Sequence, residues 1–378
     1  MLLSYSVKNF CCFKEWMEVD LSLNAKVPQD VSNDLPAATA IVIKGANASG
    51  KTNALKSLAF ISWFCTNSFS IKPDEDILFE PFFDSSEKSE FNVRFMINGV
   101  EYSYDLALTR KEVLSEKIYK KEKRKVLVFN REKGDILKNS LYTKEFDVTA
   151  RRNASVISVA RQYLVAELGP FYLFFDKIRS NVNYFGLMQG LGMTVDNVSK
   201  LYKSNSELFD FAKEYLKRFD TGISDVSIDV IQIKDRDHYR PIFEFDVDGD
   251  RKKLAYTSQS RGSQELFRML LLYKLVLSVG GVLIMDEFDV YLHPDILAHL
   301  VNLFLSEKTN PLHAQLLFST HNIDILDLMG KYRTVIFNKE HGKSFCYRLD
   351  EVNDGLLRND RPIVPIYRTG RLGGIPRI

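Results

Sequence analysis

Residues 43–53 read Ile-Lys-Gly-Ala-Asn-Ala-Ser-Gly-Lys-Thr-Asn, and this stretch decides the fold of the chain. Its glycines, lysine and threonine match the G-x-x-x-x-G-K-[ST] pattern of a phosphate-binding loop. An apolar run at residues 40–43 predicts a buried strand before the loop, and the residues after it predict a helix from Gly50 to about Cys65. Strand, loop and helix follow one another in the required order, and the N-terminus of the helix favours an anion.

The residue types in this loop predict its chemistry. Glycines let backbone N–H groups turn inward around phosphate oxygens, Lys51 reaches the β- and γ-phosphates, and the Thr52 hydroxyl ligates Mg²⁺. The sequence therefore predicts that the chain binds a nucleoside triphosphate. The residues of the loop expected to contact it are Gly45, Ala46, Asn47, Ala48, Ser49, Gly50, Lys51, Thr52 and Asn53.

The composition is that of an ordinary globular protein. The 378 residues are 45% hydrophobic and 26% charged, enough for two domains or for one large domain with an insertion. A formal net charge of +2 gives no overall indication of nucleic-acid binding. The chain lacks an apolar run of about eighteen residues and a signal peptide, so no membrane contact is expected. Cytoplasmic, reduced thiols are expected at Cys11, Cys12, Cys65 and Cys346.

Hydrophobic patterning predicts an α/β fold. Asn98-Gly99 separates two alternating runs and is typical of a β-hairpin. Residues 155–218 have mostly helical spacing, and a long apolar helix is expected from about Gln264 to Val279. Further helices are expected at 294–305 and 323–328, and strands at 2–10, 16–23, 112–119, 125–131, 226–233, 241–247, 282–285, 316–319, 335–337 and 345–348.

An apolar strand, residues 282–285, ends in Asp286-Glu287. Carboxylates at this position lie at the mouth of an α/β sheet, where such folds bind ligands. Asp286 is expected to hold Mg²⁺, and Glu287 to polarise an attacking water as a general base. An ordinary polar turn is the alternative, and the phosphate-binding loop upstream makes the catalytic interpretation the better one.

Two other polar segments follow the same logic. His321 ends the next predicted strand and is positioned to contact a γ-phosphate, although a surface histidine at a strand end is the alternative. Ser260-Arg261-Gly262-Ser263 opens the long helix, where small and hydroxyl residues make either an anion site or an ordinary N-cap.

Taken in order, these motifs resemble the ABC-type ATPases of the SMC/RecF/OLD group. The chain is most similar to their compact prokaryotic branch, the AAA-like ATPases of anti-phage and abortive-infection systems such as PARIS and Septu. The resemblance extends from Val7-Lys8-Asn9-Phe10, through Asp286-Glu287-Phe288-Asp289, to the tail at residues 367–376. It implies a split ATPase head formed by residues 1–68 and 225–378, a mixed sheet flanked by helices, and an inserted strand-and-helix lobe at 69–224.

The resemblance also implies a composite site. ATP and Mg²⁺ would lie between Gly45–Thr52 of one subunit and Ser260, Gly262 and Ser263 of a second subunit in a head-to-head dimer or higher oligomer. Glu287, His321 and Lys51 become the catalytic residues, Thr52 and Asp286 the metal ligands, and Asp289 a residue that crosses the interface. The chain departs from the family in three ways. Arg261 and Ser263 alter the signature, the segment between the motifs lacks long coiled-coil heptads, and the Q-loop glutamine has no clear position, since its candidates Gln162 and Gln189 lack supporting context.

The function implied is that of an ATP-binding and ATP-hydrolysing switch in a defence complex, controlling a separate effector nuclease or toxin. A DNA-maintenance ATPase of the RecF/SMC type and a non-hydrolytic, ATP-dependent scaffold are the alternatives. A basic run offers a possible DNA contact, although charge runs usually face water. It consists of Lys120, Lys121, Lys123, Arg124 and Lys125, and Arg151-Arg152 form a second basic run.

Overall fold

The computed structural model describes residues 1–141, 151–183, 186–188, 193–219, 222–290, 292–352, 357–358 and 361–375. Its centre is a six-stranded sheet in which the phosphate-loop strand β3 lies between two parallel neighbours, and β18 at one edge is antiparallel. In spatial order the strands are β18 (Lys343–Arg348), β17 (Thr334–Glu340), β3 (Ala40–Gly45), β16 (Gln315–Ser319), β15 (Val282–Met285) and β9 (Ile178–Ser180).

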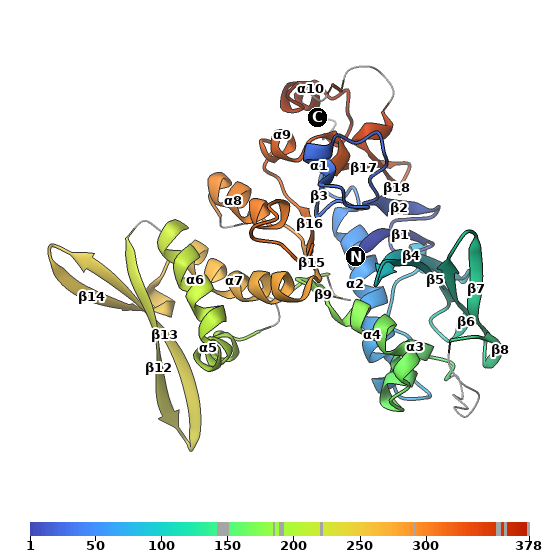
Figure 1. Ribbon diagram of the computed structural model, residues 1–378, viewed down its shortest axis with the longest axis horizontal. Coiled ribbons are helices and arrows are strands. Elements are labelled where there is room, and N and C mark those ends of the chain that lie inside the picture. The colour runs from blue at the N-terminus through green and yellow to red at the C-terminus, as the bar shows by residue number, and fades with distance from the viewer. Residues whose placement is uncertain are drawn as a thin grey trace.

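A second, seven-stranded antiparallel sheet lies on one side of this core (Figure 1). The residue range 69–224, assigned above to an inserted lobe, contains β4 to β8, and β4 pairs directly with the N-terminal strand β1. The domain boundaries stay a prediction. In spatial order the strands are β2 (Met17–Asp20), β1 (Leu2–Lys8), β4 (Ser89–Ile97), β5 (Val100–Leu108), β6 (Val113–Lys121), β7 (Lys125–Glu132) and β8 (Asp135–Asn139).

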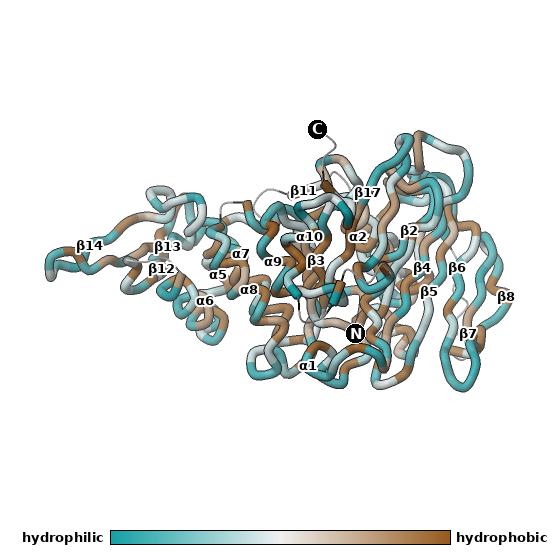
Figure 2. Tube along the Cα trace, turned by 90° about the horizontal axis from the view of Figure 1, so that it is seen from above, coloured by the Kyte–Doolittle hydropathy of each residue, from teal (hydrophilic) through white to brown (hydrophobic). Residues whose placement is uncertain are grey.

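Alternation along β3 divides the molecule into two cores. Ile41 and Ile43 face the antiparallel sheet and helix α2 (Lys51–Asn67), whereas Ala40 and Val42 face a core formed with later helices. Those helices are α7 (Arg261–Val279), α8 (Pro294–Leu305), α9 (Ile325–Met329) and α10 (Val364–Arg368). Figure 2 shows hydrophobic residues concentrated along the central elements. The predicted α/β class, with a mixed sheet flanked by helices, is confirmed.

The chain also forms an arm that extends away from the head (Figure 1). The arm combines a three-stranded antiparallel sheet with two amphipathic helices that pack against α7. Its elements are α5 (Val195–Ser204), α6 (Ser206–Phe219), β12 (Ile223–Ile233), β13 (Arg236–Val247) and β14 (Asp250–Ala255). The longest helix in the described residues is α7, with 19 residues. Among those residues there is thus no long coiled coil.

Several elements differ from the expectation. The segment 155–218 contains α3 (Val156–Gln162) and α4 (Gly169–Asp176), but also the short strands β9, β10 (Val182–Asn183) and β11 (Gly186–Leu187). These strands are two or three residues long, too short to show a period. Strand β14 was also not expected, because all six of its residues are exposed and their polar composition resembles a loop. A short helix, α1 (Gln29–Ser32), lies in the segment between β2 and β3.

Two sets of buried polar contacts hold the head together, one between distant segments and one between neighbouring strands. The Gln315 side chain, at the start of β16, accepts a hydrogen bond from Leu2 N (2.6 Å) and donates to Leu2 O (2.9 Å) and Ala38 O (3.0 Å). Within the antiparallel sheet, Arg131 Nη1 lies 3.0 Å from Glu116 Oε2, and both side chains are fully buried. These contacts place polar groups inside the fold without leaving them unpaired.

Candidate nucleotide site

The phosphate-binding loop joins β3 to α2, as predicted. Two of its glycines are required by close packing. A Cβ on Gly45 would lie 2.5 Å from Ser49 Oγ and 2.6 Å from Phe337 O, and Gly50 has a φ of +108° with Cys12 Sγ 2.9 Å from its Cβ position. The loop therefore bends tightly against β17 and the N-terminal segment, which leaves its backbone close to anything bound above it.

Lys51, the first residue of α2, points back over the loop. Its Nζ donates hydrogen bonds to Gly45 O (2.9 Å) and Ala46 O (3.0 Å). Burial lowers the pKa of Lys51, and the nearby carboxylates of Asp286 and Glu287 oppose that shift. No ion pair of the described residues includes Lys51, so this buried ammonium is held by neutral carbonyl oxygens within its own loop.

The two predicted metal ligands lie in contact. Thr52 Oγ1 donates to Asp286 Oδ2 at 2.6 Å, and Asp286 is 2% exposed. Ser319 Oγ, at the end of β16, donates to Asp286 Oδ1. Because β3, β16 and β15 are adjacent parallel strands, their carboxyl ends bring the threonine, the serine and the aspartate to one edge of the sheet.

Asn181, which the sequence did not indicate, fixes the backbone of Asp286. Its Nδ2 donates to Asp286 O (2.9 Å), and its Oδ1 accepts from Asp286 N (2.7 Å). Asn181 follows β9, the edge strand beside β15. A lone asparagine after a three-residue strand gives no recognisable signal in the sequence.

Glu287 is exposed, and its backbone adopts a positive φ of 48°. The Glu287 N–H donates to Ser319 Oγ at 2.9 Å. The same serine therefore contacts both acidic residues, one through its carboxylate and the other through its backbone. This leaves the Glu287 carboxylate free of the sheet edge that Asp286 occupies.

A cavity of about 640 Å³ opens beside the loop. Lys44, Gly45, Ala46, Asn47 and Ser49 form one side of it, and His321 lies on the rim. The rest of the lining comes from Ile323, Phe337, Asn338, Lys339, Glu340, Tyr367, Gly374 and Ile375. The structure thus brings His321 to the same cavity as the phosphate-binding loop.

The backbone around His321 is held by two oppositely charged side chains. Asp289 accepts hydrogen bonds from His321 N (3.1 Å to each oxygen) and from Asn322 N (3.1 Å). Lys44 Nζ donates to Thr320 O (2.8 Å) and Asn322 O (3.1 Å). Asp289, expected at a subunit interface, here contacts its own chain.

The start of α7 does not line this cavity. Ser260 caps the helix through a hydrogen bond from Ser263 N to its Oγ (3.1 Å), and the two hydroxyl oxygens are 2.8 Å apart. Gly262 lies between them in the first turn. The residues Ser260, Gly262 and Ser263 therefore form a regular capped helix start, and their contact with a nucleotide stays a prediction.

Of the remaining candidates, those among the described residues do not line the cavity beside the loop. Gln162 ends α3 and is exposed, while Gln189 falls outside the described residues. Arg151 and Arg152 donate to the carbonyls of Phe69 (2.8 Å) and Pro73 (3.1 Å), so this basic pair supports a loop.

The run at 120–125 lies at the β6–β7 turn. Three of its cations lie near acids: Lys120 beside Glu122 (2.9 Å), Lys121 beside Glu101 (2.7 Å) and Lys125 beside Asp105 (3.7 Å).

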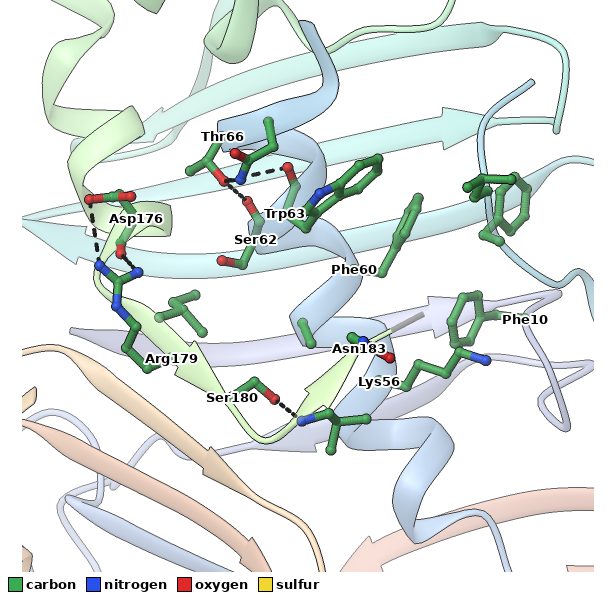
Figure 3. A pocket seen from close by; sticks show the side chains of 16 residues that line it. Phe10, Lys56, Phe60, Ser62, Trp63, Thr66, Asp176, Arg179, Ser180 and Asn183 are labelled. Carbon is green, nitrogen blue, oxygen red and sulfur yellow. Dashed lines mark hydrogen bonds and ion pairs between the residues drawn. The ribbon is translucent and has the colours of Figure 1, made fainter. Parts of the chain in front are cut away.

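A second cavity, of about 470 Å³, lies along another face of α2 (Figure 3). Its walls are largely apolar, with Phe10, Phe60 and Trp63 among them. Its buried cation, Lys56, already lies 3.2 Å from Glu80. An apolar lining with a paired cation does not suit a triphosphate, so the cavity beside the loop is the better nucleotide site.

The phosphate-binding loop, the acids after β15 and the histidine after β16 are the motifs of an AAA/ABC-type ATPase. The chain belongs to the family described as "AAA domain, putative AbiEii toxin, Type IV TA system", which matches residues 40–327. That match spans both the phosphate-binding loop and His321.

Solved structures of SMC heads are similar to the chain. The SMC head domain from Thermotoga maritima is 15% identical, covers 92% of this chain and 98% of its own, and has a TM-score of 0.45. An SMC head bound to the C-winged helix domain of ScpA is 12% identical (93% and 98% covered, TM-score 0.47). The SMC head domain bound to the C-terminal domain of ScpA, derived from Pyrococcus furiosus, is 11% identical (93% and 97%, 0.46). No curated protein matches the chain.

In the part of the chain that the structure describes, no helix combines the length and the apolar character needed to cross a bilayer.

Proposed function

We propose that this chain binds and hydrolyses ATP with Mg²⁺, as the switch subunit of a prokaryotic defence complex. The observation that supports this most directly is the arrangement of Lys51, Thr52 and Asp286. A buried ammonium without a carboxylate partner lies over a glycine cradle, beside a hydroxyl and a carboxylate that are already in contact. An anion with a bound cation complements that arrangement.

The residues fit Mg²⁺ and the phosphates of ATP. Ser49 Oγ is buried in the loop without a hydrogen-bond partner, and any side chain at Gly45 would fill the space next to it. The Thr52 hydroxyl and the Asp286 carboxylate are oxygen ligands, which Mg²⁺ prefers, and they would hold it. When bound, Mg²⁺ supplies positive charge that offsets the charge of the phosphate oxygens.

Each remaining residue has a role that its position supports. Lys51 binds phosphate oxygens in place of the carbonyls of Gly45 and Ala46. Glu287, whose carboxylate is exposed beside Asp286, orients and polarises the attacking water and takes its proton. His321, on the rim of the cavity, senses the γ-phosphate.

The proposal requires a second copy of the chain. In one copy the cavity beside the loop holds only part of the proposed site, because its lining contains neither the start of α7 nor Lys51, Thr52, Asp286 and Glu287. Ser260, Gly262 and Ser263 of the second copy would close the site with the N-terminus of α7, which is favourable for an anion. ATP would then control how two heads meet.

The output is proposed to come from a separate effector. The family description reads "putative AbiEii toxin, Type IV TA system", which supports a role within a toxin–antitoxin system. Co-expression with the neighbouring genes and identification of the co-purified protein would test this. Recovery of a nuclease or toxin supports the proposal, whereas recovery of the chain alone on DNA would favour a DNA-maintenance ATPase.

The experiment that tests the catalytic proposal is Glu287→Gln. We expect phosphate release to fall by about 10²-fold or more, because the general base is lost while the phosphate-binding groups remain. ATP should then hold the variant as a dimer, measured by light scattering. Glu307→Gln, an exposed glutamate on the segment after α8, is the matched control. If wild-type protein releases no phosphate with any partner or DNA, the scaffold alternative replaces this proposal.

A further inference from the structure

Lys44 occupies a position where the strand pattern calls for an apolar residue. Ala40 and Val42 on β3 face the core formed with α7 and α8, and Lys44 is the next residue on that face. It is 3% exposed, and burial lowers its pKa to about 8. Removing an ammonium from water costs several kcal/mol before its contacts offset the loss. A lysine here therefore has to do more than fill space.

Its contacts are with the backbone of the loop that carries His321. The ammonium of Lys44 donates to the carbonyls on either side of the histidine, Thr320 O at 2.8 Å and Asn322 O at 3.1 Å. Asp289 accepts from the amides of His321 and Asn322. Lys44 thus binds the carbonyl oxygens of this loop, and Asp289 binds its N–H groups. Because neither charged side chain can exchange roles with the other, the loop has one favoured orientation.

The two charged residues come from the two motifs that surround the nucleotide. Lys44 directly precedes Gly45, the first glycine of the phosphate-binding loop, and Asp289 lies two residues after Glu287. The loop at 320–322 is consequently attached to both motifs through short, charge-assisted hydrogen bonds. A displacement of either motif would be transmitted to the histidine.

We propose that Lys44 is a positioning residue for His321: with Asp289 it forms a clamp that sets the histidine over the nucleotide cavity and couples it to movements of the phosphate-binding loop. The inference deepens the proposed function and rests on it, because it needs His321 to act on the γ-phosphate. Lys44 itself does not touch the reacting atoms in this role.

The test is a double-mutant cycle on phosphate release. Lys44→Met keeps the length of the side chain and removes its donors. At saturating ATP we expect it to lower kcat about tenfold, because a small misplacement of a catalytic group is costly. In a His321→Ala background the same substitution should lower kcat less than twofold, because the residue it positions is gone. An equal loss in both backgrounds, or no loss in either, overturns the inference.

A second measurement is independent of turnover. Amide hydrogen exchange of residues 320–322 should become at least about tenfold faster in Lys44→Met, since the carbonyl contacts that restrain the loop are lost. Lys56→Met is the matched control: this lysine is also buried, on α2, but pairs with Glu80 away from the loop. Unchanged exchange in Lys44→Met overturns the clamp.

The two proposals can fail separately. Wild-type phosphate release with a Lys44→Met variant of normal kcat would refute the positioning role and leave the ATPase proposal intact. Absence of wild-type phosphate release would refute the ATPase proposal and with it the positioning role in catalysis, and the exchange measurement would then decide whether the clamp exists.

Discussion

The Glu116–Arg131 pair in the antiparallel sheet and the Lys51–Asp286 site beside the parallel sheet are both buried and charged, but their contacts differ. Arg131 donates to Glu116 and to the carbonyls of Ala154 (2.8 Å) and Lys133 (2.7 Å). Glu116 also accepts from the side chains of Tyr104 (2.8 Å) and Ser155 (2.7 Å), and from Val156 N. Lys51, by contrast, contacts two neutral carbonyls of its own loop.

This difference distinguishes charged groups that stabilise the fold from a charged group that is available to bind a ligand. Inside the sheet, each charge is neutralised by the other and each hydrogen-bonding group has a partner, so the pair is complete within the chain. At the phosphate-binding loop the ammonium is desolvated without a paired anion, which leaves its strongest interaction for a ligand. The burial of a charged group therefore does not by itself indicate a binding site. The burial of a charged group without a counter-ion in the chain does.

The largest expected effect comes from breaking the complete pair. Arg131→Met should destabilise the protein by about 3–5 kcal/mol, because it leaves the Glu116 carboxylate buried without its counter-ion. Denaturant unfolding followed by circular dichroism measures this. A loss below about 1 kcal/mol would mean that the pair does not stabilise the fold. The control is Arg240→Met, which replaces an exposed arginine on β13.

Lys51→Met should show the opposite pattern. We expect ATP affinity to fall about 100-fold or more, since the substitution removes charge-assisted hydrogen bonds to phosphate. The unfolding free energy should change by no more than about 1 kcal/mol, because the desolvation cost that disappears with the ammonium offsets the lost carbonyl contacts and the lost attraction to Asp286 and Glu287. Isothermal titration calorimetry and denaturant unfolding of the same preparation test both parts. A large stability loss with intact affinity would reverse the comparison.

Local sequence predicts one of these two regions and not the other. The phosphate-binding loop and Asp286-Glu287 are recognisable because each motif is contiguous and follows an apolar strand. The alignment of Thr52, Asp286 and Ser319 then follows from three parallel strands ending at one edge. The family and the α/β class were predictable from the same contiguous motifs, and both predictions are confirmed.

What the sequence did not reveal depends on distant partners. Lys44 lies 276 residues from Thr320 and Asn181 lies 105 residues from Asp286, so no spacing rule relates them. In the sequence, Glu116 and Arg131 resemble charged residues on the exposed face of a strand. The structure shows instead that both side chains are buried. Strand β9, with three residues, is below the length at which alternation can be recognised.

Lys44 should contribute to the stability of the protein to an extent that depends on pH. Its pKa in the folded protein is about 8, below the ordinary lysine value of 10.5, with burial the main cause; Asp289 opposes that shift and Lys51 adds to it. Between about pH 8 and 10.5 the unfolded chain therefore binds more protons at this lysine than the folded chain, and the contribution of Lys44 to stability rises with pH. Wild-type stability should rise relative to Lys44→Met over this interval, by about 1–3 kcal/mol. Denaturant unfolding at several pH values measures it; a constant difference contradicts the lowered pKa.

The smallest effect is expected at the β6–β7 turn. Among the described residues, Lys123 and Arg124 are exposed and form no ion pair. Lys120, Lys121 and Lys125 each form an ion pair with an acidic side chain. If this turn binds DNA, replacing Lys123 and Arg124 by Gln should reduce the slope of log affinity against log salt by about two. Replacing the three paired lysines should change it less. DNA retention that is unaffected by all five substitutions removes the turn as a DNA contact.

Gln315 has a consequence for how the chain folds during synthesis. Its side chain completes the hydrogen bonding of Leu2, 313 residues earlier, so β1 cannot reach its final environment until most of the chain has left the ribosome. Contacts this distant in sequence slow folding and prolong the exposure of unpaired strands. Fragments that end before residue 315 should therefore be poor substitutes for the whole head, because they leave the first strand without the side chain that completes its hydrogen bonding.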